Sequence, residues 1–188
     1  MLSKPALRRE ILVARGELTA AARVAAETAL RQRILDCVGA LNSVAAYVSI
    51  GTEPGTSGLL AALRERGTTV LLPVLRPDND LDWAVFDGSF AAGPHGLLEP
   101  VGDRRGIEAI AAVDAIVVPA LAVDRAGHRL GRGGGSYDRA LARAADVLTI
   151  ALLYDNELLD KIPVQPHDRP VDAAATPSAL HRFIPRRS

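Results

Sequence analysis

The chain has 188 residues, 48% of them hydrophobic and 23% charged, which is typical of one globular domain with a full hydrophobic core. Its 22 basic and 22 acidic side chains cancel, which argues against a protein drawn to nucleic acid or to anionic lipid by its overall charge. No apolar run reaches the roughly 18 residues of a membrane span, the N-terminus does not resemble a signal peptide, and the lone Cys37 excludes an internal disulfide, so we expect a cytoplasmic protein.

Two helices are predicted at the N-terminus. Ser3 can cap a first helix, whose first turn tolerates Pro5 and whose apolar residues continue at helical spacing through 7–15. Thr19 can cap a second helix over 19–38, which carries Leu30, Ile34 and Leu35 on one side.

Beyond these helices the hydrophobic period changes to that of strands. Short apolar runs rich in β-branched residues alternate with helix-like stretches, a pattern that favours a mostly parallel sheet buried on both faces. The runs are 43–50, 68–75, 115–121 and 147–154, and the helix-like stretches are 57–67, 106–113 and 136–145. Segment 81–87 alternates apolar and polar residues instead, which indicates an edge or hairpin strand.

We therefore expect an α/β fold in which residues 1–188 form one three-layer domain. A mostly parallel central sheet is flanked by helices, two further helices stand at the N-terminus, and the tail 181–188 is frayed. In such sheets ligands bind beyond the carboxyl ends of the strands, where the loops 51–58 and 154–160 and a glycine-rich loop lie.

The glycine-rich loop, HRLGRGGGSYDR at 128–139, has the composition of a phosphate-binding segment. Glycine lets backbone N–H groups approach a ligand closely, and a helix starting near Ser136 would add free donors and a positive dipole end. Arg129 and Arg132 can supply positive charge. A plain turn is the alternative interpretation. The loop is neither a Walker P-loop nor a dinucleotide fingerprint, because it lacks G-K-[ST] and has serine where the last glycine would stand.

The segment VPALAVDRAGHRLGRGGGSYDRAL at 118–141 resembles the signature of the 5-formyltetrahydrofolate cyclo-ligases. Four further family landmarks occur in order: KPALR at 4–8, GTEPGT at 51–56, GLLEP at 96–100 and HDRPVDAAAT at 167–176. The resemblance therefore spans nearly the whole chain. One departure is Ser136, which replaces the first tyrosine of the family's Y-Y-D.

The resemblance implies an enzyme of folate one-carbon metabolism. Members of this family use ATP and Mg²⁺ to convert 5-formyltetrahydrofolate into 5,10-methenyltetrahydrofolate, with release of ADP and phosphate, through a phosphorylated formyl group. Such chemistry depends on positioning and charge neutralisation. The expected partners are 5-formyltetrahydrofolate and ATP, with no nucleic acid or membrane, and the expected state is a monomer.

The resemblance also assigns residues. The implied ATP-binding residues are Lys4, Arg8, Arg129, Leu130, Gly131, Arg132, Gly133, Gly134, Gly135, Ser136 and Tyr137. The implied folate-binding residues are Val48, Glu53, Arg132, Gly133, Gly134, Gly135 and Ser136. Arg132 and Tyr137 are the implied catalytic residues, and Asp138 and Asp172 match the aspartates associated with magnesium, whose hard oxygen ligands suit that ion.

Several alternatives remain at this point. Ser136 leaves open a paralogue that activates a different formamide, and a nucleotide- or folate-binding regulator is a second possibility. An RNA-binding module using the arginines of 8–33 is a third, although their even mixture with acidic residues is typical of a solvated helix face. Trp83 and Tyr154 are either walls of a pterin pocket or core residues, and no histidine shows metal-binding spacing.

Overall fold

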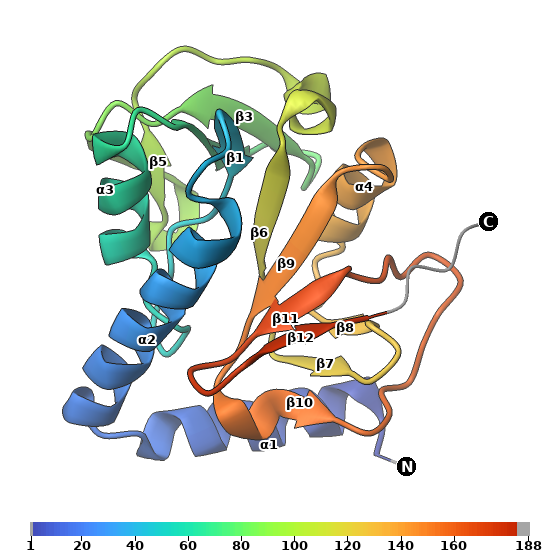
Figure 1. Ribbon diagram of the computed structural model, residues 1–188. Helices are drawn as coiled ribbons and strands as arrows, with labels where there is room; N and C mark the ends of the chain where they lie inside the picture. The colour runs from blue at the N-terminus through green and yellow to red at the C-terminus, as the bar shows by residue number, and fades with distance from the viewer. Residues whose placement is uncertain (1, 184–188) are drawn as a thin grey trace.

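The computed structural model describes residues 2–183, and its centre is a mostly parallel sheet (Figure 1). Within these residues the sheet has seven strands in the order β12-β11-β9-β6-β1-β2-β3. Their bounds are Ser43–Ala45 for β1, Thr69–Leu75 for β2, Leu81–Val85 for β3, Ala115–Pro119 for β6, Leu148–Leu152 for β9, Ala173–Ala175 for β11 and Leu180–Arg182 for β12. The edge strands β3 and β12 are antiparallel to their neighbours, and the other pairs are parallel.

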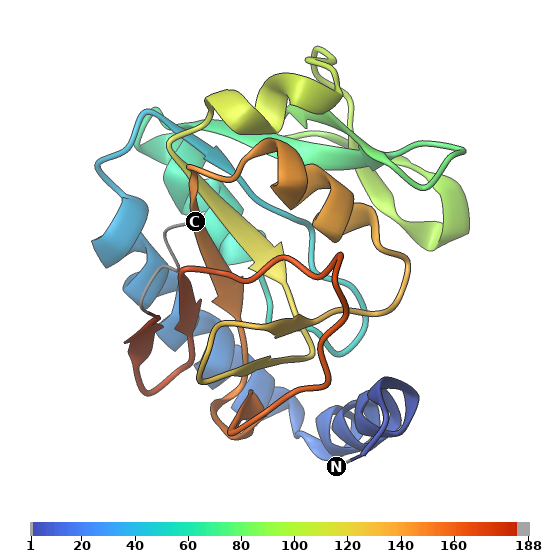
Figure 2. The same ribbon diagram turned by 90° about the vertical axis from the view of Figure 1, so that its right-hand side faces the viewer.

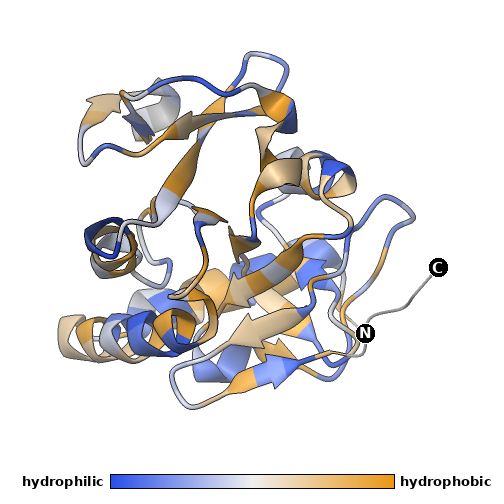
Figure 3. Ribbon diagram, turned by 45° about the horizontal axis from the view of Figure 1, so that its top comes forward, coloured by the Kyte–Doolittle hydropathy of each residue, from blue (hydrophilic) through white to orange (hydrophobic). Residues whose placement is uncertain are grey.

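Helices cover both faces of this sheet. On one face, α2 (Ala20–Val38) and α3 (Ser57–Glu65) pack against Val44 and Val117. On the other, the 3-10 helix η2 (Ile107–Ala112) and α4 (Ser136–Arg143) pack against Ala45 and Ile116. Successive residues of a strand point to opposite faces, so the continuous apolar runs fill two core layers at once. Figure 3 shows this as largely orange strands at the centre of the molecule. The expected three-layer α/β fold is confirmed.

The N-terminal helix α1 (Lys4–Glu17) lies apart from these layers. Figure 1 shows it beside β10 and β7. It covers a small sheet of β7 (Ala122–Asp124), β8 (Arg129–Leu130) and β10 (Leu158–Leu159). Ile11 of α1 packs there against Leu130 and Ile162. This position brings the start of α1 to residues 131–135 of the glycine-rich loop, which follow β8 directly.

The predicted helix starts are confirmed by hydrogen bonds. The Ser3 hydroxyl accepts from the Ala6 N–H at 3.4 Å, and the Thr19 hydroxyl accepts from the Ala22 N–H at 3.1 Å. Segment 106–113 contains a 3-10 helix rather than an α-helix. A six-residue stretch is too short for the apolar pattern to distinguish the two.

Two predictions, one of a strand and one of a frayed tail, need correction. In the run 43–50 the strand ends at Ala45, although the Ala46 N–H still donates to the Leu71 carbonyl of β2. Farther along the run, the Thr56 hydroxyl donates to the Tyr47 carbonyl and accepts from the Ser49 N–H. The tail predicted to fray begins inside β12, where His181 and Arg182 pair with β11. Residues 184–188 of that prediction lie outside the described part of the chain.

A second hairpin projects beside β2 and was not predicted. It consists of β4 (Phe90–Ala92), the 3-10 turn η1 (Pro94–Gly96) and β5 (Leu98–Pro100). Figure 2 shows it extending away from the central sheet. No helix within residues 2–183 is both long enough and apolar enough to span a membrane.

An ion pair fastens α4 to the start of β3. Arg143 donates to both carboxylate oxygens of Asp80, and the Leu81 N–H donates to one of them at 2.8 Å. The hydrogen bond from Arg143 holds the pKa of Asp80 below its ordinary value, against the opposing effect of burial. A depressed folded-state pKa contributes stability that is complete above the unfolded pKa of about 3.9 and is lost as the pH falls through the folded value.

We therefore expect Asp80→Asn to lose stability at neutral pH and to lose less than the wild type on acidification. Urea unfolding from about pH 6 to about pH 2 measures this, because the lowered pKa of Asp80 places the loss below the ordinary aspartate value of about 3.9. Asp146→Asn is the matched control, because Asp146 is exposed and no side-chain hydrogen bond to it occurs within residues 2–183. Free-energy curves for Asp80→Asn and wild type that run parallel with pH would contradict the assignment.

Candidate active site

The strand order creates a crevice between β1 and β6. From β1 the chain passes through α3 to β2 on one side, and it later returns to β6 on the other side of β1. Loops leaving two such strands diverge, and ligands bind in the space between them. Here the loop after β1 carries Glu53, and the segment after β6 leads through the β7–β8 hairpin to the glycine-rich loop.

A cavity of about 340 Å³ lies at this crevice. Most of the sequence-predicted site residues line it together: Lys4, Arg8, Val48, Glu53, Arg129, Gly131, Arg132, Gly133, Gly134, Gly135, Ser136, Tyr137 and Asp138. They come from α1, from the loop after β1, and from the end of β8 through the first turn of α4. Three segments far apart in the sequence therefore meet around one space.

The glycine-rich loop has a backbone that only glycine adopts readily. Gly133 and Gly135 have φ angles of 111° and 70°, in the region that disfavours side chains. Gly135 is the N-cap of α4, so the first N–H groups of that helix are free for a ligand. The Arg8 Nε donates to the Gly131 carbonyl at 2.8 Å, which places a guanidinium from α1 against the loop.

Arg129 lines the floor of the cavity and is held there by several contacts. Its side chain is only 4% exposed, and its Nη2 pairs with Asp138 Oδ1 at 3.0 Å, while its Nη1 donates to the Pro119 carbonyl at 3.2 Å. Its guanidinium carbon lies 5.8 Å from the centre of the Tyr137 ring. Arg129 therefore orients both Asp138 and Tyr137.

Tyr137 is a neutral hydroxyl in this site. Burial raises the pKa of Tyr137 well above its ordinary value, and the nearby Glu53 carboxylate raises it further, against the effect of Arg129. A phenol in this state can donate or accept a hydrogen bond, and it does not act as a base near neutral pH.

Glu53 and Arg132 form an ion pair across the cavity. Arg132 Nε lies 3.0 Å from Glu53 Oε1, and Glu53 Oε2 accepts from the Ile50 N–H at 2.9 Å. Glu53 is only 7% exposed while Arg132 is 45% exposed, so the carboxylate is fixed and the guanidinium is free to move. A ligand with N–H donors can replace Arg132 as the partner of Glu53, and the guanidinium of Arg132 can then bind a phosphate.

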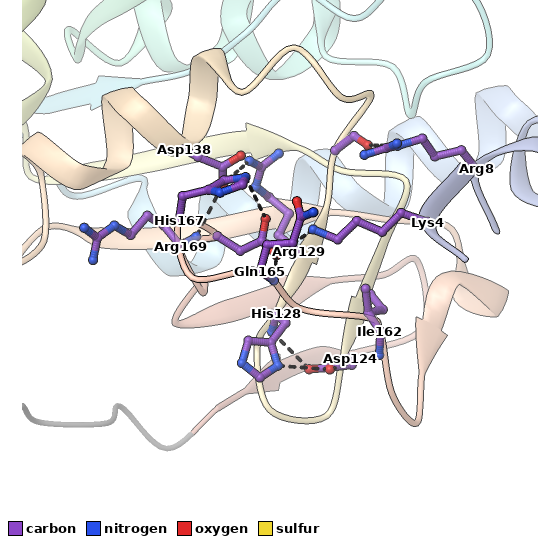
Figure 4. A network of polar contacts seen from close by, with 12 residues as sticks. Lys4, Arg8, Asp124, His128, Arg129, Asp138, Ile162, Gln165, His167 and Arg169 are labelled. Carbon is purple, nitrogen blue, oxygen red and sulfur yellow. Dashed lines mark hydrogen bonds and ion pairs between the residues drawn. The ribbon is translucent and has the colours of Figure 1, made fainter. Parts of the chain in front are cut away.

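Three residues to which the sequence analysis assigned no site role close the other side of the cavity. Figure 2 shows the chain between β10 and β11 running past β7 and β8, and Gln165, His167 and Asp168 of this stretch line the cavity. Asp168 Oδ2 lies 2.6 Å from Lys4 Nζ and accepts from the Gln165 N–H at 2.6 Å (Figure 4). The Arg169 N–H donates to Asp138 Oδ1 at 3.4 Å, which brings this segment beside the glycine-rich loop.

Two predicted residues are not brought to the cavity. Asp172 Oδ2 accepts from the Thr149 N–H at 2.8 Å near the start of β9, at the end of the sheet opposite to the cavity. The structure therefore does not join Asp172 to Asp138, and Asp168, four residues earlier, lies beside the cavity instead. Leu130 is fully buried in the core beneath α1, and its carbonyl accepts from the Leu121 N–H.

Trp83 and Tyr154, the two aromatic residues considered as walls of a pterin pocket, are core residues instead. Trp83 of β3 is fully buried in the core layer that includes Ile110 of η2. Tyr154 is 5% exposed, and the Arg15 guanidinium carbon lies 5.5 Å from the centre of its ring. Neither lines the cavity, and the loop 154–160 does not reach it either. That loop instead supplies Glu157, which binds Arg15 of α1.

Comparison with known proteins decides the family. The model of the 5-formyltetrahydrofolate cyclo-ligase family matches residues 1–177. This chain belongs to that family. The match includes every segment that lines the cavity, from Lys4 to Asp168.

Individual relatives agree with this assignment. The chain is 43% identical over 182 residues to the 5-formyltetrahydrofolate cyclo-ligase of Mycolicibacterium smegmatis, covering 93% of this chain and 94% of that protein. It is 31% identical over 145 residues to the cyclo-ligase of Escherichia coli, covering 74% and 80% of the two chains. The solved structure of Aquifex aeolicus 5,10-methenyltetrahydrofolate synthetase is 27% identical and superposes with a TM-score of 0.84, over 98% of this chain and 95% of that one.

Proposed function

We propose that this protein is an ATP-dependent 5-formyltetrahydrofolate cyclo-ligase, producing 5,10-methenyltetrahydrofolate, ADP and phosphate. The observation that carries the proposal is the meeting of Lys4 and Arg8, Glu53, and the glycine-rich loop around one cavity. The family resemblance assigns the same residues to ATP and folate, although they come from three distant parts of the chain.

The proposed chemistry explains why ATP is needed. The oxygen of the N5 formamide is a poor leaving group, so it first attacks the γ-phosphorus of ATP and ADP departs. The resulting iminophosphate carries an electrophilic carbon, which N10 attacks. N10 gives up its proton, inorganic phosphate leaves with the former formyl oxygen and takes up that proton, and the cationic methenyl bridge between N5 and N10 remains. The protein's part is to align the reactants and to neutralise the phosphate charges.

The residues of the cavity divide this work by position and charge. Free N–H groups of the glycine-rich loop and of the α4 N-terminus suit the phosphates, and Lys4 and Arg8 add charge from α1. Glu53 is placed to accept N–H donors of the pterin ring, which frees Arg132 to stabilise the transferring phosphoryl group. The Tyr137 hydroxyl can position a phosphate or formyl oxygen.

The carboxylates in the cavity fit a magnesium ion. Asp138 Oδ1 is engaged by Arg129 and Asp168 Oδ2 by Lys4. Within residues 2–183 Asp138 Oδ2 has no hydrogen-bond donor, and the cation nearest Asp168 Oδ1 is the exposed His167, whose Nε2 lies 3.9 Å away. One or two carboxylates plus substrate phosphates are the usual ligands of Mg²⁺, and no cluster of three or more metal-ligating side chains occurs in the described residues. When bound, the ion would neutralise developing charge on the β- and γ-phosphates. We propose Asp138 and Asp168 as its ligands.

A single assay tests the proposed function. Purified protein is mixed with 5-formyltetrahydrofolate, ATP and Mg²⁺, and the methenyl product is followed by its ultraviolet absorbance. We expect product growth that stops when any one component is omitted. Retained ATP binding without product would instead favour a paralogue acting on another formamide, and Ser136 in the cavity wall is the residue to examine first in that case.

A further inference from the structure

Tyr47 lines the cavity, and its hydroxyl has no hydrogen-bond partner within residues 2–183. The residue lies two positions after the end of β1 and is only 3% exposed. Its backbone carbonyl accepts from the Thr56 hydroxyl at 2.8 Å, and Thr56 is itself fully buried, so the position of Tyr47 is fixed. The phosphate, pterin and metal contacts proposed for the cavity leave this side chain unused.

The hydroxyl of Tyr47 brings no advantage to the fold by itself. A buried hydroxyl without a partner costs stability, because it has lost its hydrogen bonds to water and gained none in return. The ring of Tyr47 belongs to the apolar cluster between the sheet and the helices α2 and α3, where phenylalanine would fill the same volume without that cost. A hydroxyl in this state is explained by a partner that is not part of the chain, either a ligand or an ordered water.

Tyr47 supplies the cavity with a neutral hydrogen-bond donor. Burial raises the pKa of Tyr47 well above its ordinary value, and the Glu53 carboxylate raises it further. The hydroxyl therefore keeps its proton near neutral pH. Two other residues that line the cavity have a buried side-chain atom without a partner in the described part of the chain, Glu99 at Oε1 and Arg129 at Nε. The first belongs to a carboxylate, which only accepts, and the second to a cation.

The formyl oxygen is the substrate atom that suits a neutral donor. The phosphates are anionic and suit cations and free N–H groups, while the N–H donors of the pterin suit Glu53. The formyl oxygen is a neutral acceptor that must still attack phosphorus, and a neutral phenol withdraws less of its electron density than a cation would. Tyr47 precedes the loop that carries Glu53, and Tyr137 at the start of α4 packs against the same apolar cluster. Tyr47 therefore lies where the folate and phosphate sides of the cavity meet.

We propose that Tyr47 is a further catalytic residue, whose hydroxyl donates a hydrogen bond to the formyl oxygen of 5-formyltetrahydrofolate. This inference rests on the proposed function. One lone pair of the formyl oxygen accepts from Tyr47, and another forms the bond to the γ-phosphorus as the bond from that phosphorus to the ADP oxygen breaks. When the carbon–oxygen bond later breaks, its electron pair stays on the oxygen that leaves with phosphate, and the hydrogen bond strengthens. Tyr47 keeps its proton throughout.

Direct binding of two folates tests the proposal without depending on turnover. The probes are 5-formyltetrahydrofolate and 5-methyltetrahydrofolate, which carries a methyl group on N5 and no formyl oxygen, and calorimetry without ATP gives their dissociation constants. We expect Tyr47→Phe to weaken binding of the formyl compound about fivefold, the effect of one lost hydrogen bond, and to leave the methyl compound unchanged. In turnover we expect kcat to fall about tenfold or more, since the hydrogen bond strengthens as phosphate departs, while the KM for ATP is unchanged.

Urea unfolding of the same variant separates catalysis from a structural role. Tyr47→Phe is expected to be at least as stable as the wild type, because it removes a buried hydroxyl that has no partner. Tyr154→Phe is the matched control, because the Tyr154 hydroxyl donates to the Thr52 carbonyl at 3.4 Å and the residue does not line the cavity. This control is expected to bind both folates as the wild type does. A Tyr47→Phe protein less stable than the wild type would show a partner within the protein and overturn the proposal.

The two probes also separate this proposal from the proposed function. Equal weakening of both folates by Tyr47→Phe would show a contact with the pterin ring or a structural role. Unchanged binding of both would show that the hydroxyl meets only water. Either result overturns the role of Tyr47 at the formyl oxygen and leaves the cyclo-ligase activity standing. A wild-type protein that binds neither folate and forms no methenyl product would overturn the proposed substrate as well.

Discussion

Replacement of Asp138 by asparagine is expected to lower kcat by about 100-fold or more, the effect typical of removing a group that stabilises transition-state charge. Asparagine has the shape of aspartate, and its side-chain oxygen can still accept from Arg129 Nη2, which lies 3.0 Å from Asp138 Oδ1. The substitution therefore removes the negative charge while the local packing stays. Turnover under saturating substrates measures the loss, and an unfolding curve close to that of the wild type shows that the fold is retained.

Two other aspartates, Asp168 and Asp172, provide comparison variants for Asp138→Asn. Asp168→Asn is expected to impair the magnesium dependence of turnover as well, because Asp168 lies beside the same cavity. Asp172→Asn is expected to keep most of the activity, since its side chain binds Thr149 N–H at the opposite end of the sheet and asparagine can make the same bond. A loss in Asp172→Asn equal to that in Asp138→Asn would contradict this placement. It would then favour the pair implied by the sequence resemblance.

The comparison between Asp168 and Asp172 shows where sequence reasoning reached its limit. Both aspartates belong to the segment 167–176 that carries the resemblance, and both follow turn-forming residues. Nothing local distinguishes them. Tertiary structure gives them different surroundings, because Lys4 of α1 reaches Asp168 across 164 positions of sequence, while Asp172 is engaged where β9 and β11 begin.

Features with a local physical cause were predicted well. The hydroxyls of Ser3 and Thr19 cap helices whichever way the rest of the chain folds, and apolar runs such as 115–121 identify strands buried on two faces. The loop with Gly133 and Gly135 was recognisable because positive φ angles require glycine wherever they occur. Such local features were enough to predict the order of the main strands and helices along the chain.

Short elements held by distant partners could not be predicted in this way. Strand β4 has three residues that are all exposed, and β8 has two residues, so neither shows a period of burial. Arg15 resembles the other arginines of the first helix in sequence, yet it is 1% exposed because Glu157 lies beside it. The partner that explains its burial is 142 positions away.

Breaking the pair between Arg15 and Glu157 is expected to destabilise the fold by about 3–5 kcal/mol, because the remaining charge would be buried without a partner. Arg15 Nε lies 2.6 Å from Glu157 Oε1 and Nη2 lies 2.8 Å from Oε2, while Nη2 also donates to the Ala120 carbonyl at 2.7 Å. Both residues are 1% exposed. Urea unfolding of Arg15→Met measures the loss.

The double variant Arg15→Met with Glu157→Leu tests the cause of this loss. If an uncompensated buried charge dominates, the double variant unfolds with a higher free energy than either single variant. The pair also holds the helix that carries Lys4, so Arg15→Met is expected to raise the KM for ATP under conditions where the protein is still folded. The exposed Arg9 on the same helix provides the control, and Arg9→Met is expected to change neither quantity. An Arg15→Met protein as stable as the wild type would show instead that the apolar contacts of Ile11 are enough to hold α1 in place.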